Sequence, residues 1–175
     1  MPVMNYFGPG PQSFANYTWT STNATTQGGS VYGYTGGYGF GGNGFWDGRL
    51  GPMAGVNDSF AVYGITDTMT FAFTSPVNTV GGYFNYVPGG STPTTLAAWD
   101  ASNNLIESYN LTFVTGNGVN LGEWILFQET TPIAYFTMSD NYVAVASPVP
   151  EPSSLLLLGS GALGLAGMIR RKMML

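Results

Sequence analysis

The residues best suited to ligand chemistry lie in the loop-like segment Gly44-Phe45-Trp46-Asp47-Gly48. The flat face of an indole ring suits the apolar face of a pyranose, and a carboxylate can accept hydrogen bonds from sugar hydroxyls. Trp46 and Asp47 are therefore the candidate ligand contacts. The alternative is that tryptophans fill the core, as we expect for Trp99, which lies within an alternating strand pattern.

The acidic side chains offer only oxygen ligands, so calcium is the metal that they favour. Four acids lie in or near expected loops: Asp47, Asp58, Asp67 and Asp140. They match no recognised calcium loop, so we assign no metal site. A structural calcium ion stays an open alternative. Paired carboxylates can also hydrolyse glycosidic bonds. Glu107, Glu123 and Glu129 are better explained as solvated strand or turn residues, so we expect no cofactor and no enzyme activity.

The chain contains no cysteine and no histidine, which excludes disulfides, thiol catalysis and Ser–His nucleophile pairs. Arg49 is the only basic residue before Pro150, against eight acidic residues. Such a surface cannot neutralise phosphates, so nucleic acid is excluded as a partner. The glycines of Gly37 to Gly42 satisfy the spacing of a dinucleotide-binding loop, but they lie in a Gly-aromatic tract without the required strand and helix.

The C-terminal end combines a short motif, an apolar run and a basic cluster. Residues 153–169 carry no charge, and as a helix they would span roughly 25 Å, which is close to the minimum for crossing a bilayer. Prolines before the run fix its start. The cluster Arg170, Arg171 and Lys172 follows, and by the positive-inside tendency it orients the C-terminus toward the cytoplasm. We expect a single transmembrane helix over 153–169 and a basic tail over 170–172.

These residues resemble a family. The motif Pro150, Glu151 and Pro152, the glycine-interrupted apolar run and the basic cluster are similar to the PEP-CTERM sorting signal of exported bacterial proteins. The resemblance implies recognition by an exosortase, a membrane protease-transpeptidase that cuts near the motif. It also implies a bacterium that makes exopolysaccharide and a protein that begins as an inner-membrane precursor and ends at the cell surface or outside the cell.

The N-terminal residues 1–12 show neither the basic region nor the apolar region of a secretory signal peptide. Proteins with this sorting signal normally begin with such a peptide. We therefore expect the signal to be encoded upstream of Met1. The alternatives are a truncated sequence, or a C-terminal helix that inserts by itself while the domain stays cytoplasmic.

The remaining residues 1–147 predict one exported β-domain. Few residues are charged, aromatic residues are abundant, and no long helical stripe occurs before residue 148. Residues 1–58 are rich in glycine and aromatic residues. Val31 to Phe45 is typical of short strands with tight turns or of an ordered aromatic loop, and low-complexity disorder is a further alternative. From Ser59 onward, apolar and β-branched runs alternate with turn signals, among them Ser75-Pro76 and Thr131-Pro132. The expected strands are 18–22, 60–63, 69–73, 80–87, 95–99, 105–114, 124–127, 133–138 and 142–146.

Residues 69–145 resemble the jelly-roll-like domain that is often joined to this sorting signal. The resemblance is carried by Ser75-Pro76-Val77, by the hairpin Leu96 to Glu107 and by the last strand, Tyr142 to Val145. The fold class that we predict is all-β: an antiparallel β-sandwich, jelly-roll-like, followed by the single transmembrane helix. Residues 148–175 form the sorting signal.

The function predicted from the sequence is that of an exosortase-sorted surface or matrix protein, structural or adhesive, associated with exopolysaccharide. Its contacts would be weak and multivalent, made by aromatic and hydroxyl-rich surface. The alternative is a carbohydrate-binding module with one defined site, and a glycan-active hydrolase is the third reading. The expected partners are the exosortase, the membrane through the C-terminal helix, and polysaccharide.

Overall fold

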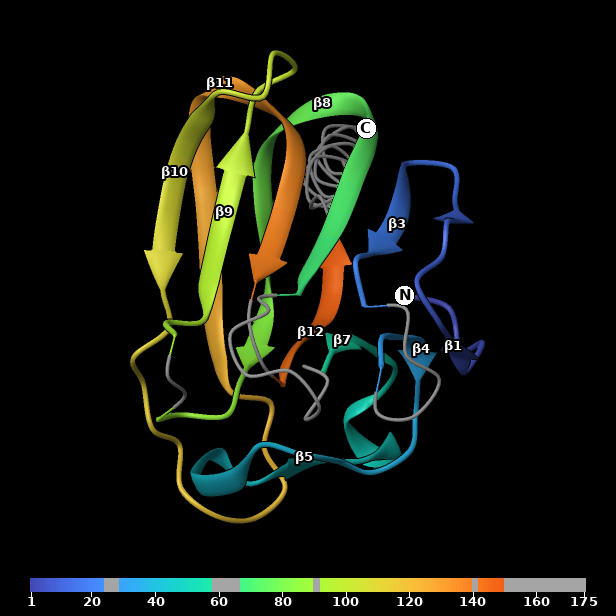
Figure 1. Cartoon of the computed structure of the whole chain (residues 1–175), viewed down its shortest axis with the longest axis vertical. Helices are drawn as coiled ribbons and strands as arrows, with labels where there is room; N and C mark the ends of the chain where they lie inside the picture. Colours follow the sequence, from blue (N-terminus) through green and yellow to red (C-terminus); the bar gives the residue numbers. More distant parts are fainter. Residues whose placement is uncertain (24–28, 58–66, 90–91, 140–141, 150–175) are drawn as a thin grey trace, which may run out of the picture.

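The computed structural model describes residues 1–23, 29–57, 67–89, 92–139 and 142–149, and their regular structure is almost entirely β-strand (Figure 1). Every ladder between the described strands is antiparallel, so the all-β antiparallel prediction is confirmed. The strands are β1 (Tyr6–Phe7), β2 (Gln12–Ser13), β3 (Tyr17–Ser21), β4 (Val31–Tyr34), β5 (Tyr38–Gly39), β6 (Phe45–Trp46), β7 (Met53–Val56), β8 (Thr68–Asn85), β9 (Thr95–Trp99), β10 (Leu105–Asn110), β11 (Glu123–Ser139) and β12 (Val143–Val149).

The strands build two layers that share β8 and β11. In the first layer the strand order is β10-β9-β11-β8-β3-β2. To this layer β11 contributes its later half and β8 its earlier half. In the second layer the strand order is β11-β8-β12-β7-β4-β1. Here β11 contributes its earlier half and β8 its later half. Figure 1 shows β8 and β11 arching together at one end of the molecule. One continuous sheet is thus folded over into a sandwich.

The bend in β8 and β11 lies at two prolines. The sequence predicts turns at Ser75-Pro76 and Thr131-Pro132 that would separate four strands, and this expectation is wrong because β8 and β11 each continue through their proline. The register of the ladder shifts between the pairs Gln128–Thr79 and Ile133–Val77. A residue without an N–H is tolerated where the ladder is interrupted, and strands change sheets at such bends.

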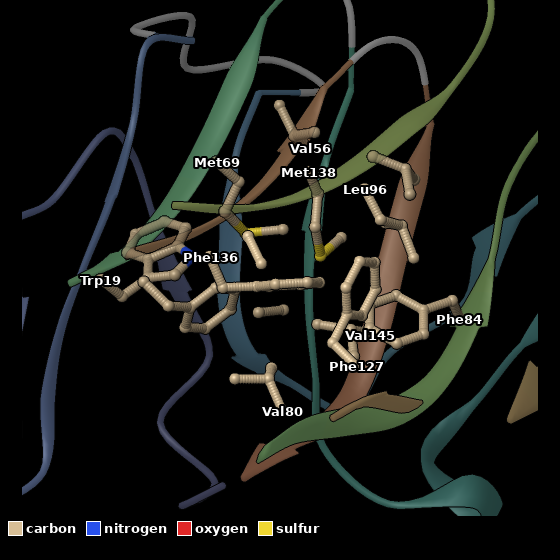
Figure 2. Packing of buried hydrophobic residues seen from close by; sticks show 14 of the residues in the cluster. Trp19, Val56, Met69, Val80, Phe84, Leu96, Phe127, Phe136, Met138 and Val145 are labelled. Atoms are coloured by element: carbon tan, nitrogen blue, oxygen red, sulfur yellow. The ribbon is translucent and has the colours of Figure 1, made fainter. Parts of the chain in front are cut away.

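The core fills the space between the two layers. Alternate residues of the first layer, including Met69, Phe136 and Met138, meet Phe84 and Phe127 of the second. The Phe136 ring centroid lies 5.8 Å from that of Phe84 and 5.3 Å from that of Phe127. Figure 2 shows these side chains gathered between the strands, with Trp19 and Phe84 toward opposite ends of the row. Both layers therefore depend on one apolar interior.

The glycine–aromatic residues 35–52 form a lobe on the outer side of the second layer. The lobe contains β5, β6 and two short 3-10 helices, η1 (Gly41–Asn43) and η2 (Gly48–Leu50). Its rings pack on the faces of β4, β7 and β12 that point away from the main core, in a second buried cluster that includes Tyr38, Phe40, Trp46 and Ala144. Of the alternatives for Val31 to Phe45, the structure shows short strands: β4, β5 and β6.

Several further strands agree with their predicted ranges. The hairpin predicted over Leu96 to Glu107 is present as β9 and β10, and Thr95–Trp99 has the predicted bounds. The strand predicted to reach Val114 ends at Asn110, where Leu111 instead bonds to Thr94. The strand predicted over 60–63 lies outside the described residues. That the sandwich is jelly-roll-like stays a prediction.

Candidate functional site

The outer side of the first layer presents a row of hydroxyl groups. Met69, Phe71, Phe136 and Met138 point into the core, and the residues that alternate with them point outward because successive strand side chains face opposite sides. The outward residues that carry a hydroxyl group are all half-buried. We call them the threonine face: Thr18, Thr20, Thr68, Thr70, Thr95, Thr137 and Ser139.

Two aromatic rings border a shallow groove on the threonine face. Trp99 and Tyr135 are directly opposed partners on β9 and β11. With Thr70, Asn103 and Thr137 they line a cavity of about 430 Å³, which we call the Trp99 groove. All five lining side chains are uncharged, so the groove suits a neutral ligand that offers both apolar faces and hydroxyls.

The Trp99 ring is held in place by a hydrogen bond. Its Nε1–H donates to Thr137 Oγ1 at 2.9 Å, and the Thr137 hydroxyl in turn donates to the backbone oxygen of Ala97 at 3.5 Å. A fixed ring loses little conformational entropy when a ligand stacks on it. The groove is thus prepared before any ligand arrives.

The β9–β10 turn places Asn103 at the rim of the groove. Asp100 organises the turn by accepting hydrogen bonds from the backbone N–H groups of Ser102 and Asn104 and from the Asn104 side chain, each at 2.8 Å. The Asn104 side chain is the main reason why the pKa of Asp100 lies below its ordinary value. Asn103 adopts a positive φ of 60°, which asparagine tolerates better than most residues.

The structure places the two ligand contacts predicted from the sequence elsewhere. Trp46 is fully buried in the second cluster, and its Nε1–H donates to the backbone oxygen of Gly51 at 3.0 Å. Asp47 accepts from the backbone N–H of Arg49 at 2.9 Å and forms an ion pair with its guanidinium at 2.6 Å. Trp46 thus packs as a core side chain in this structure, and ligand contact by these two residues stays a prediction.

The other acids form no cluster larger than a pair within the described residues. Asp67 is buried and accepts a hydrogen bond from Thr22 at 3.1 Å, and burial raises its pKa. Glu107 and Glu129 are close neighbours on β10 and β11, and the hydrogen bond between their carboxyls raises the pKa of Glu107. Within the described residues, no group of three or more histidine, cysteine or acidic side chains could hold a metal ion. Asp58 and Asp140 lie outside the described residues.

A network of buried amides fixes the lobe to the end of the sandwich. The Asn43 side chain donates to the Tyr86 oxygen at 3.1 Å and accepts from the Thr115 N–H at 2.9 Å. The Asn43 backbone oxygen accepts from the side chains of Asn85 and Asn120. A cavity of about 480 Å³ lies beside this network. Its one aromatic ring is Tyr86, whose hydroxyl already donates to the backbone oxygen of Phe113.

The sorting motif begins at the last described strand. β12 ends at Val149, so Pro150, Glu151, Pro152, the apolar run and the basic cluster Arg170, Arg171 and Lys172 lie outside the described residues. A family model for the PEP-CTERM protein-sorting motif matches residues 148–172. The chain carries a PEP-CTERM sorting motif. The motif implies processing by an exosortase and export toward the cell surface.

Within the described ranges, no helix is long and apolar enough to cross a membrane. The transmembrane helix expected over residues 153–169 falls outside those ranges.

Two further comparisons add little. No curated protein matches the chain. Among solved structures, the chain is similar to a mutant of the lectin binding domain of Lectinolysin complexed with Lewis b, at 10% identity and a TM-score of 0.32. The match covers 53% of this chain and 66% of that chain, just under two thirds of its length. At that score the similarity supports no argument about fold or function.

Sequence reasoning missed the Trp99 groove, although its signal was present. Thr95, Ala97 and Trp99 share one phase of β9, and Leu96 and Ala98 share the other. Comparing these phases with the Thr–apolar alternation in β8 and β11 would have placed Trp99 with the hydroxyls rather than with the core.

Proposed function

We propose that this protein is an exosortase-sorted surface protein that associates with neutral exopolysaccharide through its threonine face. The Trp99 groove is the observation that carries the proposal. Its two rings can stack on the apolar faces of sugar residues, and Thr70, Asn103 and Thr137 can exchange hydrogen bonds with their hydroxyls.

The charge distribution supports a neutral rather than an anionic polysaccharide. Arg49 is the only basic residue before Pro150, and it is paired with Asp47 in the lobe. Anionic sugars would meet acids without compensating cations. The role that follows is structural or adhesive, and many weak contacts along one polymer would give it strength.

The test is affinity electrophoresis of the full chain in a polyoxyethylene detergent, through gels that contain a neutral glucan or the anionic polysaccharide alginate. We expect the glucan to retard the wild-type chain and alginate to leave its mobility unchanged. Trp99→Ala should lose most of the retardation, because the ring is the largest contact surface in the groove.

The matched control is Trp124→Ala, which removes an exposed tryptophan from the outer side of the other layer. It should keep the wild-type retardation. Near-ultraviolet circular dichroism verifies that both variants are folded. Equal retardation of Trp99→Ala and the wild type would refute the proposal.

A carbohydrate-binding module with one defined site is the second candidate, and the same groove favours it. Titration with short oligosaccharides separates the two functions. Saturable binding of a short oligomer supports a defined site, and binding that appears only with long polymers supports the multivalent role.

We assign no catalytic step to the residues before the sorting motif. The Trp99 groove is lined by uncharged side chains. Of the Glu107–Glu129 pair, Glu107 is exposed and Glu129 is half-buried. In this proposal the only covalent chemistry is that of the exosortase.

A further inference from the structure

The outer side of the second layer carries an exposed apolar patch that the lobe does not cover. Tyr83, Trp124 and Leu126 are 39%, 48% and 46% exposed. Tyr83 and Trp124 are opposed partners on β8 and β11, with ring centroids 5.1 Å apart at 69°. We call these three residues the Trp124 patch.

Gly81 lets the patch spread across β8. A Cβ atom at Gly81 would stand 2.8 Å from Leu126 Cδ1 and 3.1 Å from Trp124 Cζ2, so both side chains lie over the glycine. They lean away from the edge strand β11 and toward β12. The result is a broad apolar surface made of uncharged groups.

The patch adjoins the point where the chain leaves the sandwich. Val149, the last residue of β12, is the partner of Gly81 across the ladder. Only residues 150–152 separate it from the apolar run 153–169. Four residue steps reach at most about 14 Å. Insertion of residues 153–169 into a bilayer therefore holds Gly81 and the patch next to the membrane surface.

We propose that the Trp124 patch docks on the lipid interface of the membrane that holds the precursor. Tryptophan and tyrosine prefer this interface because their rings are apolar with one polar end. The net negative charge of the residues before Pro150 disfavours attraction to anionic headgroups, so the contact is apolar and suits zwitterionic lipid. The inference concerns the precursor, goes beyond polysaccharide association, and rests on insertion of residues 153–169.

Docking has a consequence for processing. With the patch on the interface, β12 ends at a fixed height above the bilayer, and Pro150, Glu151 and Pro152 follow directly. The sorting motif is then presented to a membrane-embedded exosortase at a constant distance, rather than on a domain that tumbles freely.

The experiment measures tryptophan fluorescence of the full chain reconstituted in phosphatidylcholine vesicles, with and without brominated phosphatidylcholine. Trp124 is the most exposed tryptophan on this side, whereas Trp19 and Trp46 are fully buried. We expect bromolipid to quench the wild-type chain. Trp124→Phe should lose most of this quenching, and the matched control Trp99→Phe, on the opposite side of the sandwich, should keep it.

A second variant tests the patch without removing the reporter. The double change Tyr83→Ser with Leu126→Ser keeps Trp124 and should weaken quenching by about twofold or more, because it removes apolar contact with the interface. Flotation of each variant with the vesicles verifies insertion of the tail, and circular dichroism verifies folding.

Three outcomes overturn the proposal. Equal quenching of Trp124→Phe and the wild type in floating vesicles would show that the patch is away from lipid. Failure of the full chain to float would remove the insertion on which docking rests. Quenching that is absent in vesicles but appears in nanodiscs that hold one copy of the chain would show that a second copy, rather than lipid, covers the patch in the vesicles. Neither of the first two results bears on glucan retardation, which is measured in detergent.

Discussion

The two outer sides of the sandwich follow the same strand alternation but have different surroundings. The threonine face carries small hydroxyl side chains around Trp99 and Tyr135, and it is not covered by the lobe. The outer side of the second layer carries larger apolar groups, and the lobe covers the part formed by β4, β7 and β12. An outward strand residue is therefore exposed, or buried in a second core, depending on whether another part of the chain packs over it.

The largest loss of stability should follow from a substitution in the core that both layers share. Phe136→Ala deletes a fully buried ring that contacts Phe84 and Phe127. We expect it to lower the free energy of unfolding by about 3–5 kcal/mol, measured by urea denaturation. Leu126→Ala, at an exposed position, is the control and should lose about 0.5 kcal/mol or less. Similar losses for both would contradict a common core.

The second largest effect should be confined to the lobe and its contacts, with the threonine face unchanged. Asn43→Ala leaves Thr115 N–H and the Tyr86 oxygen without their partner inside the network, which should cost about 1–3 kcal/mol. Hydrogen exchange should become faster in the lobe and at residues 113–122, with the strands of the threonine face unchanged. The exposed Asn78→Ala serves as the control. Equal acceleration on both sides would mean that the lobe is no separate unit.

The sequence predicted the strands better than it predicted the surroundings of their residues. Thr95–Trp99 and its hairpin follow from local signals, because alternation and a polar turn are encoded within twelve residues. The local sequence predicts breaks at Pro76 and Pro132, but their effect depends on a register shift between β8 and β11, at pairs that are 49 and 56 residues apart in the chain. Local patterns carry no information on such a pairing.

The two tryptophans Trp46 and Trp99 show the same limit at the candidate site. Gly44 to Gly48 has the composition of a surface loop, yet Trp46 is buried because β4, β7 and β12 assemble beneath it. Trp99 lies in an apolar strand, yet it faces outward because Leu96 and Ala98 occupy the inward phase. In both cases the deciding contacts are long-range.

A substitution on the threonine face should have a smaller effect, on glucan binding. Thr137→Val keeps the shape of the side chain but removes the acceptor for Trp99 Nε1–H and one hydroxyl of the groove. We expect glucan retardation to fall by about three- to tenfold in apparent affinity, equivalent to about 0.7–1.4 kcal/mol for one hydrogen-bonding group. Thr79→Val, on the second layer, should leave retardation unchanged. Retention of full affinity by Thr137→Val would limit the groove to ring stacking.

The smallest effect concerns pH and the turn beside the groove. The pKa of Asp100 lies below its ordinary value of 3.8, chiefly because of the Asn104 side chain. A lowered folded-state pKa gives stability that is present above about pH 4 and is lost as the pH falls through the folded value. Asp100→Asn should therefore be less stable than the wild type at neutral pH, with the difference shrinking in acid, as measured by thermal unfolding across pH.

Asp67 provides the opposite sign for that measurement. Burial raises its pKa above 3.8, so its ionised form disfavours the folded state, and stability is gained as the pH falls through the raised value. The advantage of Asp67→Asn over the wild type should accordingly diminish in acid. A gain of stability at neutral pH for Asp100→Asn, the sign expected for Asp67→Asn, would contradict the hydrogen bonds assigned to Asp100.

The position of β12 has a mechanical consequence. β12 is hydrogen-bonded on both sides, to β7 and to β8, and the sorting tail continues from its end. A pull transmitted along the tail, while a polymer holds the opposite side of the sandwich, loads both ladders at once in shear instead of peeling them bond by bond. The strand from which the sorting tail continues is therefore also the one placed to bear tension.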